Sequence, residues 1–103
     1  MEIIGLGKAG AEICKLFSEK GRKTYTVDTD VNADVVLPAA KNMEDAETNV
    51  PNLDFLKQQL KSDELLFIMA GGGVISGAAL AVLEQLKEKK ISVLYIQPDG
   101  SFL

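Results

Sequence analysis

Apolar residues fall into short runs along the chain, and these runs predict strands. Residues 2–6, 64–70 and 91–96 are short, mostly apolar segments, as expected of buried strands. Residues 23–28 are rich in β-branched and aromatic side chains, and residues 33–37 form a further extended run closed by proline. The pattern therefore predicts five strands.

Between several of these runs, apolar residues recur at the spacing of a helix that buries one face. The predicted helical stripes are Ala9, Ile13, Leu16 and Phe17; Leu53, Leu56 and Leu60; and Ala79, Val82, Leu83 and Leu86. Residues 39–52 are polar, have no clear period and lie between prolines, so they predict a loop with at most one turn of helix.

Strands that alternate with helices predict a parallel sheet with right-handed crossovers. The expected fold class is α/β: a doubly wound, Rossmann-like sheet of five strands in the order 3-2-1-4-5, with helices on both faces. The winding then reverses between strands 1 and 4. A length of 103 residues fits one domain, so residues 1–103 are expected to share a single core.

Composition narrows the possible partners. The chain has a net charge of -4 and lacks the clustered Lys and Arg side chains that nucleic acid binding usually requires. No apolar run is long enough to span a membrane. One cysteine, Cys14, cannot form an internal disulfide, and it is expected to be an unreactive helix residue. With 47% hydrophobic and 25% charged residues, the chain is expected to fold and to be cytoplasmic.

The segment GLGKAG at residues 5–10 lies between the first predicted strand and helix. Its glycines match GxGxxG, in which Gly5 permits the turn, Gly7 lets the backbone approach a phosphate and Gly10 packs helix against strand. Lys8 is either a partner for a phosphate or a solvated charge. A purely structural turn is the alternative for the whole segment.

A second glycine-rich segment, GGGVISG at residues 71–77, follows the fourth predicted strand. Three consecutive glycines, Gly71, Gly72 and Gly73, cost about 1 kcal/mol each in chain entropy relative to alanine, which is more than a structural turn needs. Their amides can form an anion-binding concavity together with Gly77, and Ser76 either caps the helix or donates to a phosphate. Both segments are therefore expected to bind phosphates at one edge of the sheet.

Two acidic residues follow the second predicted strand. Asp28 lies 18 residues after Gly10, near the position from which dinucleotide folds bind ribose hydroxyls. Asp30 is either a further contact on the ribose or base side or a turn residue.

With both segments placed, the sequence resembles the tubulin/FtsZ superfamily of cytoskeletal GTPases. Residues 67–79, FIMAGGGVISGAA, are similar to that family's strand and GGGTGTG signature, and residues 91–98 to the next strand and its proline. Residues 4–10 resemble the first phosphate loop, and VDTD at residues 27–30 resembles the family's NTD segment. The likeness extends over most of the chain.

The resemblance implies that the chain binds a guanine nucleotide, GTP or GDP, and that Mg²⁺ can bind together with it. It further implies self-association or membership of a longer chain, of which these residues are the N-terminal part. In this family hydrolysis uses acidic residues of the next subunit, placed after a long central helix that does not occur here. We therefore expect nucleotide binding without hydrolysis by this chain alone, and assign no catalytic residue and no metal ligand.

Two other functions fit the same residues. The first is a Rossmann-type regulatory domain that binds NAD, NADH or another adenine nucleotide, favoured by residues 5–10 together with Asp28. The second is a scaffold in which neither glycine segment binds a ligand.

Overall fold

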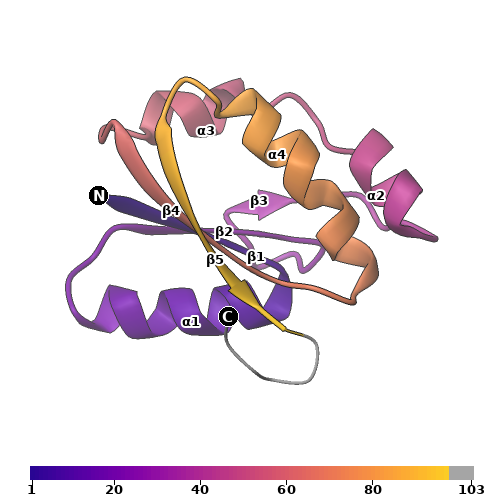
Figure 1. Ribbon diagram of the computed structural model, residues 1–103, viewed down its shortest axis with the longest axis horizontal. Coiled ribbons are helices and arrows are strands. Elements are labelled where there is room, and N and C mark those ends of the chain that lie inside the picture. The colour runs from indigo at the N-terminus through magenta and orange to yellow at the C-terminus, as the bar shows by residue number, and fades with distance from the viewer. Residues whose placement is uncertain (98–103) are drawn as a thin grey trace.

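The computed structural model describes residues 1–97 and contains one parallel sheet with helices on both sides (Figure 1). In chain order the elements are β1 (Glu2–Leu6), α1 (Gly7–Glu19), β2 (Thr24–Asp28), β3 (Val35–Val36), α2 (Met43–Thr48), α3 (Asp54–Gln59), β4 (Glu64–Ala70), the 3₁₀ helix η1 (Val74–Ala78), α4 (Ala79–Gln85) and β5 (Lys90–Ile96). Pro98, which closes the last predicted strand, lies outside the described residues.

The sheet has the predicted strand order, β3-β2-β1-β4-β5, and every pair of neighbours is parallel. Its central strand, β1, pairs with β2 on one side and β4 on the other, and Gly5 lies opposite both Thr26 and Ile68. The winding reverses between β1 and β4. In such sheets ligands bind beyond the carboxyl ends of the strands at this reversal, so the carboxyl edge is where a site is expected.

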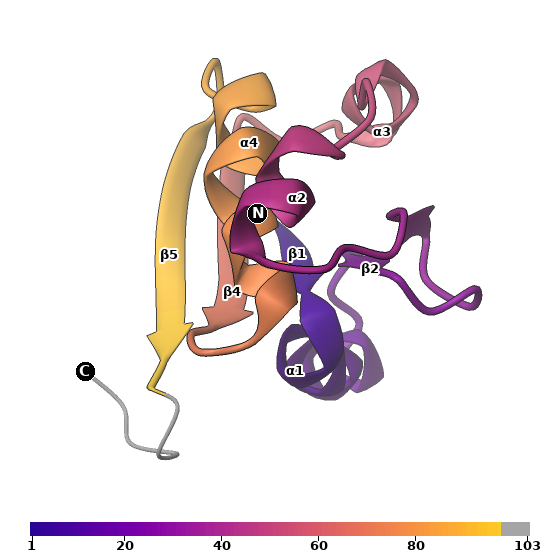
Figure 2. The ribbon, with the colours of Figure 1, turned by 90° about the vertical axis from the view of Figure 1, so that its right-hand side faces the viewer.

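The helices are divided unequally between the two faces. Figure 1 shows α1 alone on one side of the sheet and α2, α3 and α4 on the other. Figure 2 shows that α1 lies toward β1 and β2, whereas β5 forms the opposite edge. An apolar groove of about 600 Å³ remains beside α1, and Leu16 and Leu94 are among its lining residues.

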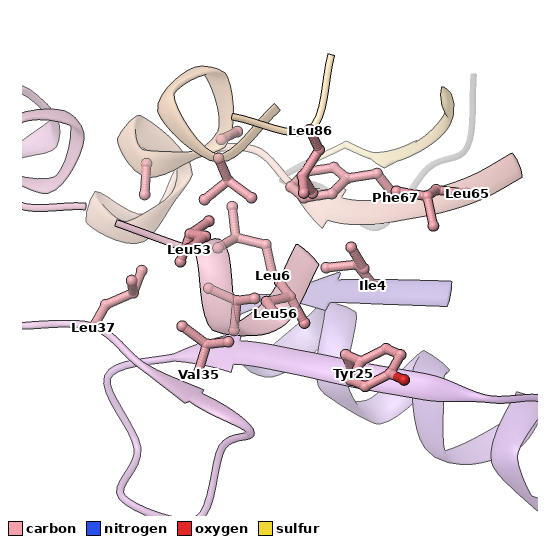
Figure 3. Close-up of a cluster of buried hydrophobic side chains, with 14 of the residues drawn as sticks. Ile4, Leu6, Tyr25, Val35, Leu37, Leu53, Leu56, Leu65, Phe67 and Leu86 are labelled. Carbon is pink, nitrogen blue, oxygen red and sulfur yellow. The ribbon is translucent and has the colours of Figure 1, made fainter. Parts of the chain in front are cut away.

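The larger core lies between the sheet and the three helices α2–α4 (Figure 3). Its side chains alternate along β1, β2 and β4 and meet Leu53 and Leu56 from the α3 region and Val82 and Leu86 from the α4 region. Phe67, at the centre of β4, is 1% exposed. Each fully buried side chain of this kind stabilises the fold by about 1.5–3 kcal/mol, so this face supplies most of the hydrophobic stabilisation.

The smaller core lies under α1. It contains Ile3 and Ile68 from the sheet and Cys14 from the helix, with Ile13 and Phe17 packed at its margin. Cys14 is 1% exposed, and its thiol lies 3.9 Å from the carbonyl oxygen of Tyr25. Burial and the nearby charge of Asp34 raise the pKa of this thiol to about 11, which favours the expected unreactive cysteine in the helix.

Two expectations about local structure were wrong in extent. The strand predicted over residues 33–37 is reduced to Val35–Val36. The loop predicted over residues 39–52 contains α2, a helix of six residues. Asn42 begins this helix by accepting a hydrogen bond from the amide of Asp45 at 2.8 Å, and the side chain of Asp45 accepts one from the amide of Lys41 at 3.3 Å. Local capping therefore forms a helix that apolar periodicity does not predict.

A buried carboxylate holds the amino end of the sheet together. Glu2 is 6% exposed, and its Oε1 accepts hydrogen bonds from the amides of Lys61 and Ser62, each at 2.7 Å. Its Oε2 accepts a longer bond, 3.4 Å, from the hydroxyl of Tyr25. These contacts fix the turn before β4.

Within residues 1–97, no helix is both long and apolar enough to cross a membrane.

Candidate functional site

The two glycine-rich segments lie side by side at the carboxyl edge of the sheet. Because β1 and β4 are parallel neighbours, the residues that follow them emerge at the same edge. A Cβ built on Gly7 would lie 3.0 Å from Cγ2 of Ile75, so the two segments are in van der Waals contact. The expected convergence of the segments is therefore present.

The first segment is not a loop, contrary to expectation. Gly5 lies within β1, and α1 begins at Gly7, directly after the strand ends. A Cβ on Gly5 would collide with the carbonyl oxygen of Gly10 and lie 2.6 Å from the Cys14 sulfur, and one on Gly10 would lie 2.7 Å from the Ile68 carbonyl oxygen. These two glycines let helix and strand approach each other, which is the packing role expected of Gly10.

Gly7 makes the abrupt change from strand to helix possible. Its φ is +74°, a backbone conformation that side chains with a Cβ rarely adopt. Residue Leu6 stands at the N-cap without a side-chain cap, and the first turn of α1 holds no acidic residue. The amides of this turn consequently point out of the helix without partners inside it, beside the exposed side chain of Lys8.

Two glycines of the second segment also serve packing. A Cβ on Gly71 would collide with the hydroxyl of Tyr95, and the amide of Gly71 donates to the carbonyl of Ile96 at 3.1 Å. A Cβ on Gly77 would collide with the carbonyl oxygen of Met43 in α2. The segment is thereby held at both ends, by β5 and by α2.

Between these ends, the backbone is open. Gly72 has a φ of +91°, and a Cβ on Gly73 would meet no atom within 4 Å. Across residues 1–97, the amides of Gly72, Gly73, Val74 and Ile75 find no protein acceptor. Successive unpaired amides beside a residue of positive φ are the arrangement that binds anions in backbone concavities.

Ser76 has a local role that neither expectation described. Its hydroxyl donates to the carbonyl oxygen of Gly73 at 2.6 Å, and its amide donates to the same oxygen at 3.1 Å. Gly73, rather than Ser76, stands at the N-cap of η1. The two bonds from Ser76 turn the carbonyl of Gly73 inward, toward η1, and so help to shape the backbone that carries the unpaired amides.

The predicted acidic residues lie next to the first segment, at the end of β2. Asp28 accepts a hydrogen bond from the amide of Thr29 at 2.7 Å, and Asp30 accepts one from the amide of Asn32 at 2.8 Å. Both line a shallow cavity of about 190 Å³ together with Ala11 of α1. Asp30 therefore forms the expected turn, and the second oxygen of each carboxylate remains available to a hydroxyl donor.

Tyr95 and Ile75 were not predicted as site residues. Tyr95 brings a hydroxyl from β5 to the base of the second segment, and Ile75 fills the space between the segments. An aromatic residue near the end of the last strand was the available signal for Tyr95, whereas the position of Ile75 depends on tertiary packing. No group of three or more potential metal ligands occurs in residues 1–97.

Comparisons with known proteins assign no family. No family model, no curated protein and no solved structure matches the chain.

Proposed function

We propose that this chain is a nucleotide-binding domain that holds phosphates at the carboxyl edge of its sheet. The observation that carries the proposal is the row of unpaired amides at Gly72, Gly73, Val74 and Ile75. The side chain of Ile75 packs against Gly7 at the start of α1, so the two segments adjoin. Unpaired amides and a helix N-terminus both favour negative charge. Two such features in contact favour a ligand with more than one phosphate.

The first candidate ligand is a guanine nucleotide, GTP or GDP, in a tubulin/FtsZ-like domain. It is supported by the likeness of residues 67–79 to that family's second phosphate loop, and by the unpaired amides that occur within this stretch. Self-association, as the family's members show, belongs to the same proposal. The geometry of the first segment is compatible with it, since Gly7 begins α1 with a φ of +74° and lies beside Ile75 of the second segment.

The second candidate is an adenine nucleotide such as NAD or NADH. Asp28 supports it, because this residue ends β2 beside α1 and has a carboxylate oxygen available for a ribose hydroxyl. The second glycine segment does not support it, since dinucleotide folds hold their phosphates with the first segment alone.

We expect binding without hydrolysis for either ligand. Phosphoryl transfer requires an in-line water and stabilisation of the developing charge. Within residues 1–97, Asp28 and Asp30 accept hydrogen bonds from local turns after β2 rather than from the glycine-rich segment after β4. A chain that binds GTP and releases no phosphate matches this expectation.

Isothermal titration calorimetry with GTP, GDP and NADH at millimolar concentration tests the proposal, together with the thermal midpoint at each ligand concentration. A bound ligand raises the midpoint, and about 100-fold excess over the Kd stabilises the fold by about 2.7 kcal/mol. Competition against a fluorescent guanine nucleotide ranks the two candidates. An intact fold that shows neither heat nor a shift in midpoint with any of the three would refute nucleotide binding.

A further inference from the structure

A second cavity opens at the carboxyl edge, on the side of the sheet that carries α2. It has a volume of about 190 Å³, and four segments of the chain meet around it. They are the end of β2 with Thr29, the residues that follow β3, helix α2 with Ala46 and its C-cap Asn49, and η1 with Val74 and Ile75. The sequence gives no sign of it, because the contributing residues are far apart in the chain.

This cavity adjoins the unpaired amides. Val74 and Ile75 are among its lining residues, and their amides are two of the four that lack an acceptor within the described chain. Ile75 also contacts Gly7. A ligand with phosphates on these amides can therefore place its next group in the cavity without crossing the sheet.

The lining suits a flat, uncharged group. It contains no Asp, Glu, Lys or Arg, and Leu37, Pro38, Ala39 and Ala40 form an apolar wall. A cavity of about 150 Å³ accommodates benzene in another protein, so about 190 Å³ leaves room for the additional ring of a purine. The polar side chains at the mouth, Thr29 and Asn49, make no side-chain hydrogen bond within residues 1–97. A carboxamide can both donate to and accept from a base.

The other cavity at this edge has opposite properties. It is lined by Asp28 and Asp30, together with Thr26 and Asn32. Carboxylates accept hydrogen bonds from sugar hydroxyls and repel phosphates, and they offer little apolar surface to the faces of a base. Of the two cavities, only the apolar one provides what a base requires.

We propose that the apolar cavity between β2, α2 and η1 binds the purine base of the nucleotide. This inference rests on the proposed function, since the amides must hold the phosphates for the base to reach the cavity. It assigns base binding to residues that follow β2 and β3 and to α2, rather than to the acidic side where Asp28 and Asp30 lie.

Ala40→Leu fills the cavity, and Ala11→Leu is the matched control. Both alanines are half-buried, each lines one of the two cavities, and the substitution adds the same atoms to each. The ligands are GTP, ATP and inorganic tripolyphosphate, which carries phosphates and no base. Calorimetry gives the affinity of each variant for each ligand, and tripolyphosphate binding also shows that the phosphate site of the variant is folded.

The proposal predicts that the wild-type chain binds at least one of the two nucleotides more tightly than tripolyphosphate. It predicts that Ala40→Leu lowers this affinity about tenfold, as expected for an overfilled pocket, and leaves tripolyphosphate affinity within about twofold. Ala11→Leu should leave the affinity for that nucleotide within the same twofold range.

Three results would overturn the inference. If Ala11→Leu rather than Ala40→Leu removes the preference for the nucleotide, the base lies on the acidic side. If the wild-type chain binds tripolyphosphate and both nucleotides equally, the phosphate site stands and the base site does not. If the wild-type chain binds none of the three ligands, the proposed function fails and the base site with it.

Discussion

The two ends of the sheet satisfy their backbone amides in opposite ways. At the amino end, the carboxylate of Glu2 accepts hydrogen bonds from two amides of the turn before β4, and the amide of Lys90 donates to the backbone carbonyl of Asp63 at 2.8 Å. At the carboxyl end, the amides of residues 72–75 have no protein acceptor within the described chain. Substitutions at the amino end should therefore affect stability, whereas those at the open carboxyl segment should affect binding.

The largest expected effect is that of Glu2→Ala at the amino end. Removing the carboxylate leaves two part-buried backbone amides without their acceptor, at a cost of about 1–3 kcal/mol each. We predict a loss of about 4 kcal/mol in the free energy of unfolding, measured by urea denaturation. Glu2→Gln, which keeps an acceptor oxygen, should lose less than half of that. Equal losses for both variants would show that the hydrogen bonds of Glu2 contribute little.

The next prediction compares Gly5, which packs against α1, with Gly73, which faces open space. Gly5→Ala places a Cβ against the backbone of Gly10, which cannot move without displacing α1, and overpacking of this kind costs about 3 kcal/mol. Gly73→Ala meets no neighbour and has a φ of -89°, so its free energy of unfolding should stay within about 0.5 kcal/mol of the wild type. Thermal and urea unfolding measure both. A similar stability for the two variants would contradict the close approach of α1 to β1.

Stability should fall at alkaline pH because of Cys14. Its pKa is about 11 in the folded protein and 9.0 in the reference state, so the unfolded chain loses this proton first as the pH rises. The free energy of unfolding is therefore unaffected well below pH 9 and decreases between pH 9 and 11, by about 2 kcal/mol at pH 11.

Cys14→Ala lacks the thiol and should lose less stability over the same range. Burial also raises the pKa of Tyr25, and Glu2 beside it adds to that shift. Both chains contain Tyr25, so its contribution cancels in the difference between them. Parallel pH profiles of the two chains would contradict the assignment to Cys14.

The smallest predicted effect concerns a single amide at the carboxyl end. Gly73→Pro removes the N–H and keeps the carbonyl that accepts from Ser76, whereas Gly73→Ala keeps both groups. We predict that Gly73→Pro lowers tripolyphosphate affinity about tenfold relative to Gly73→Ala, which corresponds to about 1.4 kcal/mol. Calorimetry measures the two affinities. Equal affinities would show that this amide does not contact the anion.

The architecture could be predicted from the sequence because it depends on local patterns. Buried runs and helical stripes alternate, and this alternation favours a parallel sheet of the doubly wound kind, in which the order found is a common one. The capping contacts of Asn42 and Asp45 were also visible in principle, since Asn-x-x-Asp is a local signal for the start of a helix. They were missed because α2 has no regular apolar stripe.

The roles of individual glycines could not be predicted in this way. Gly5, Gly71 and Gly77 each face an atom from another element, and Gly73 faces none, although all four occur in similar glycine-rich sequence. Glu2 is a similar case, because its partners Lys61 and Ser62 lie 59 and 60 residues away in the chain. Such assignments require the tertiary contacts. The resemblance to tubulin/FtsZ proteins, and the guanine nucleotide it implies, remain predictions.

The most direct test is a titration of the ¹⁵N-labelled chain with inorganic tripolyphosphate, followed by two-dimensional NMR of the backbone amides. We predict saturable shifts at Gly72, Gly73, Val74 and Ile75 and in the first turn of α1, with the amides of Lys61 and Ser62 unchanged. No shifts at millimolar tripolyphosphate, or shifts of equal size at both ends of the sheet, would contradict an anion site built from the unpaired amides.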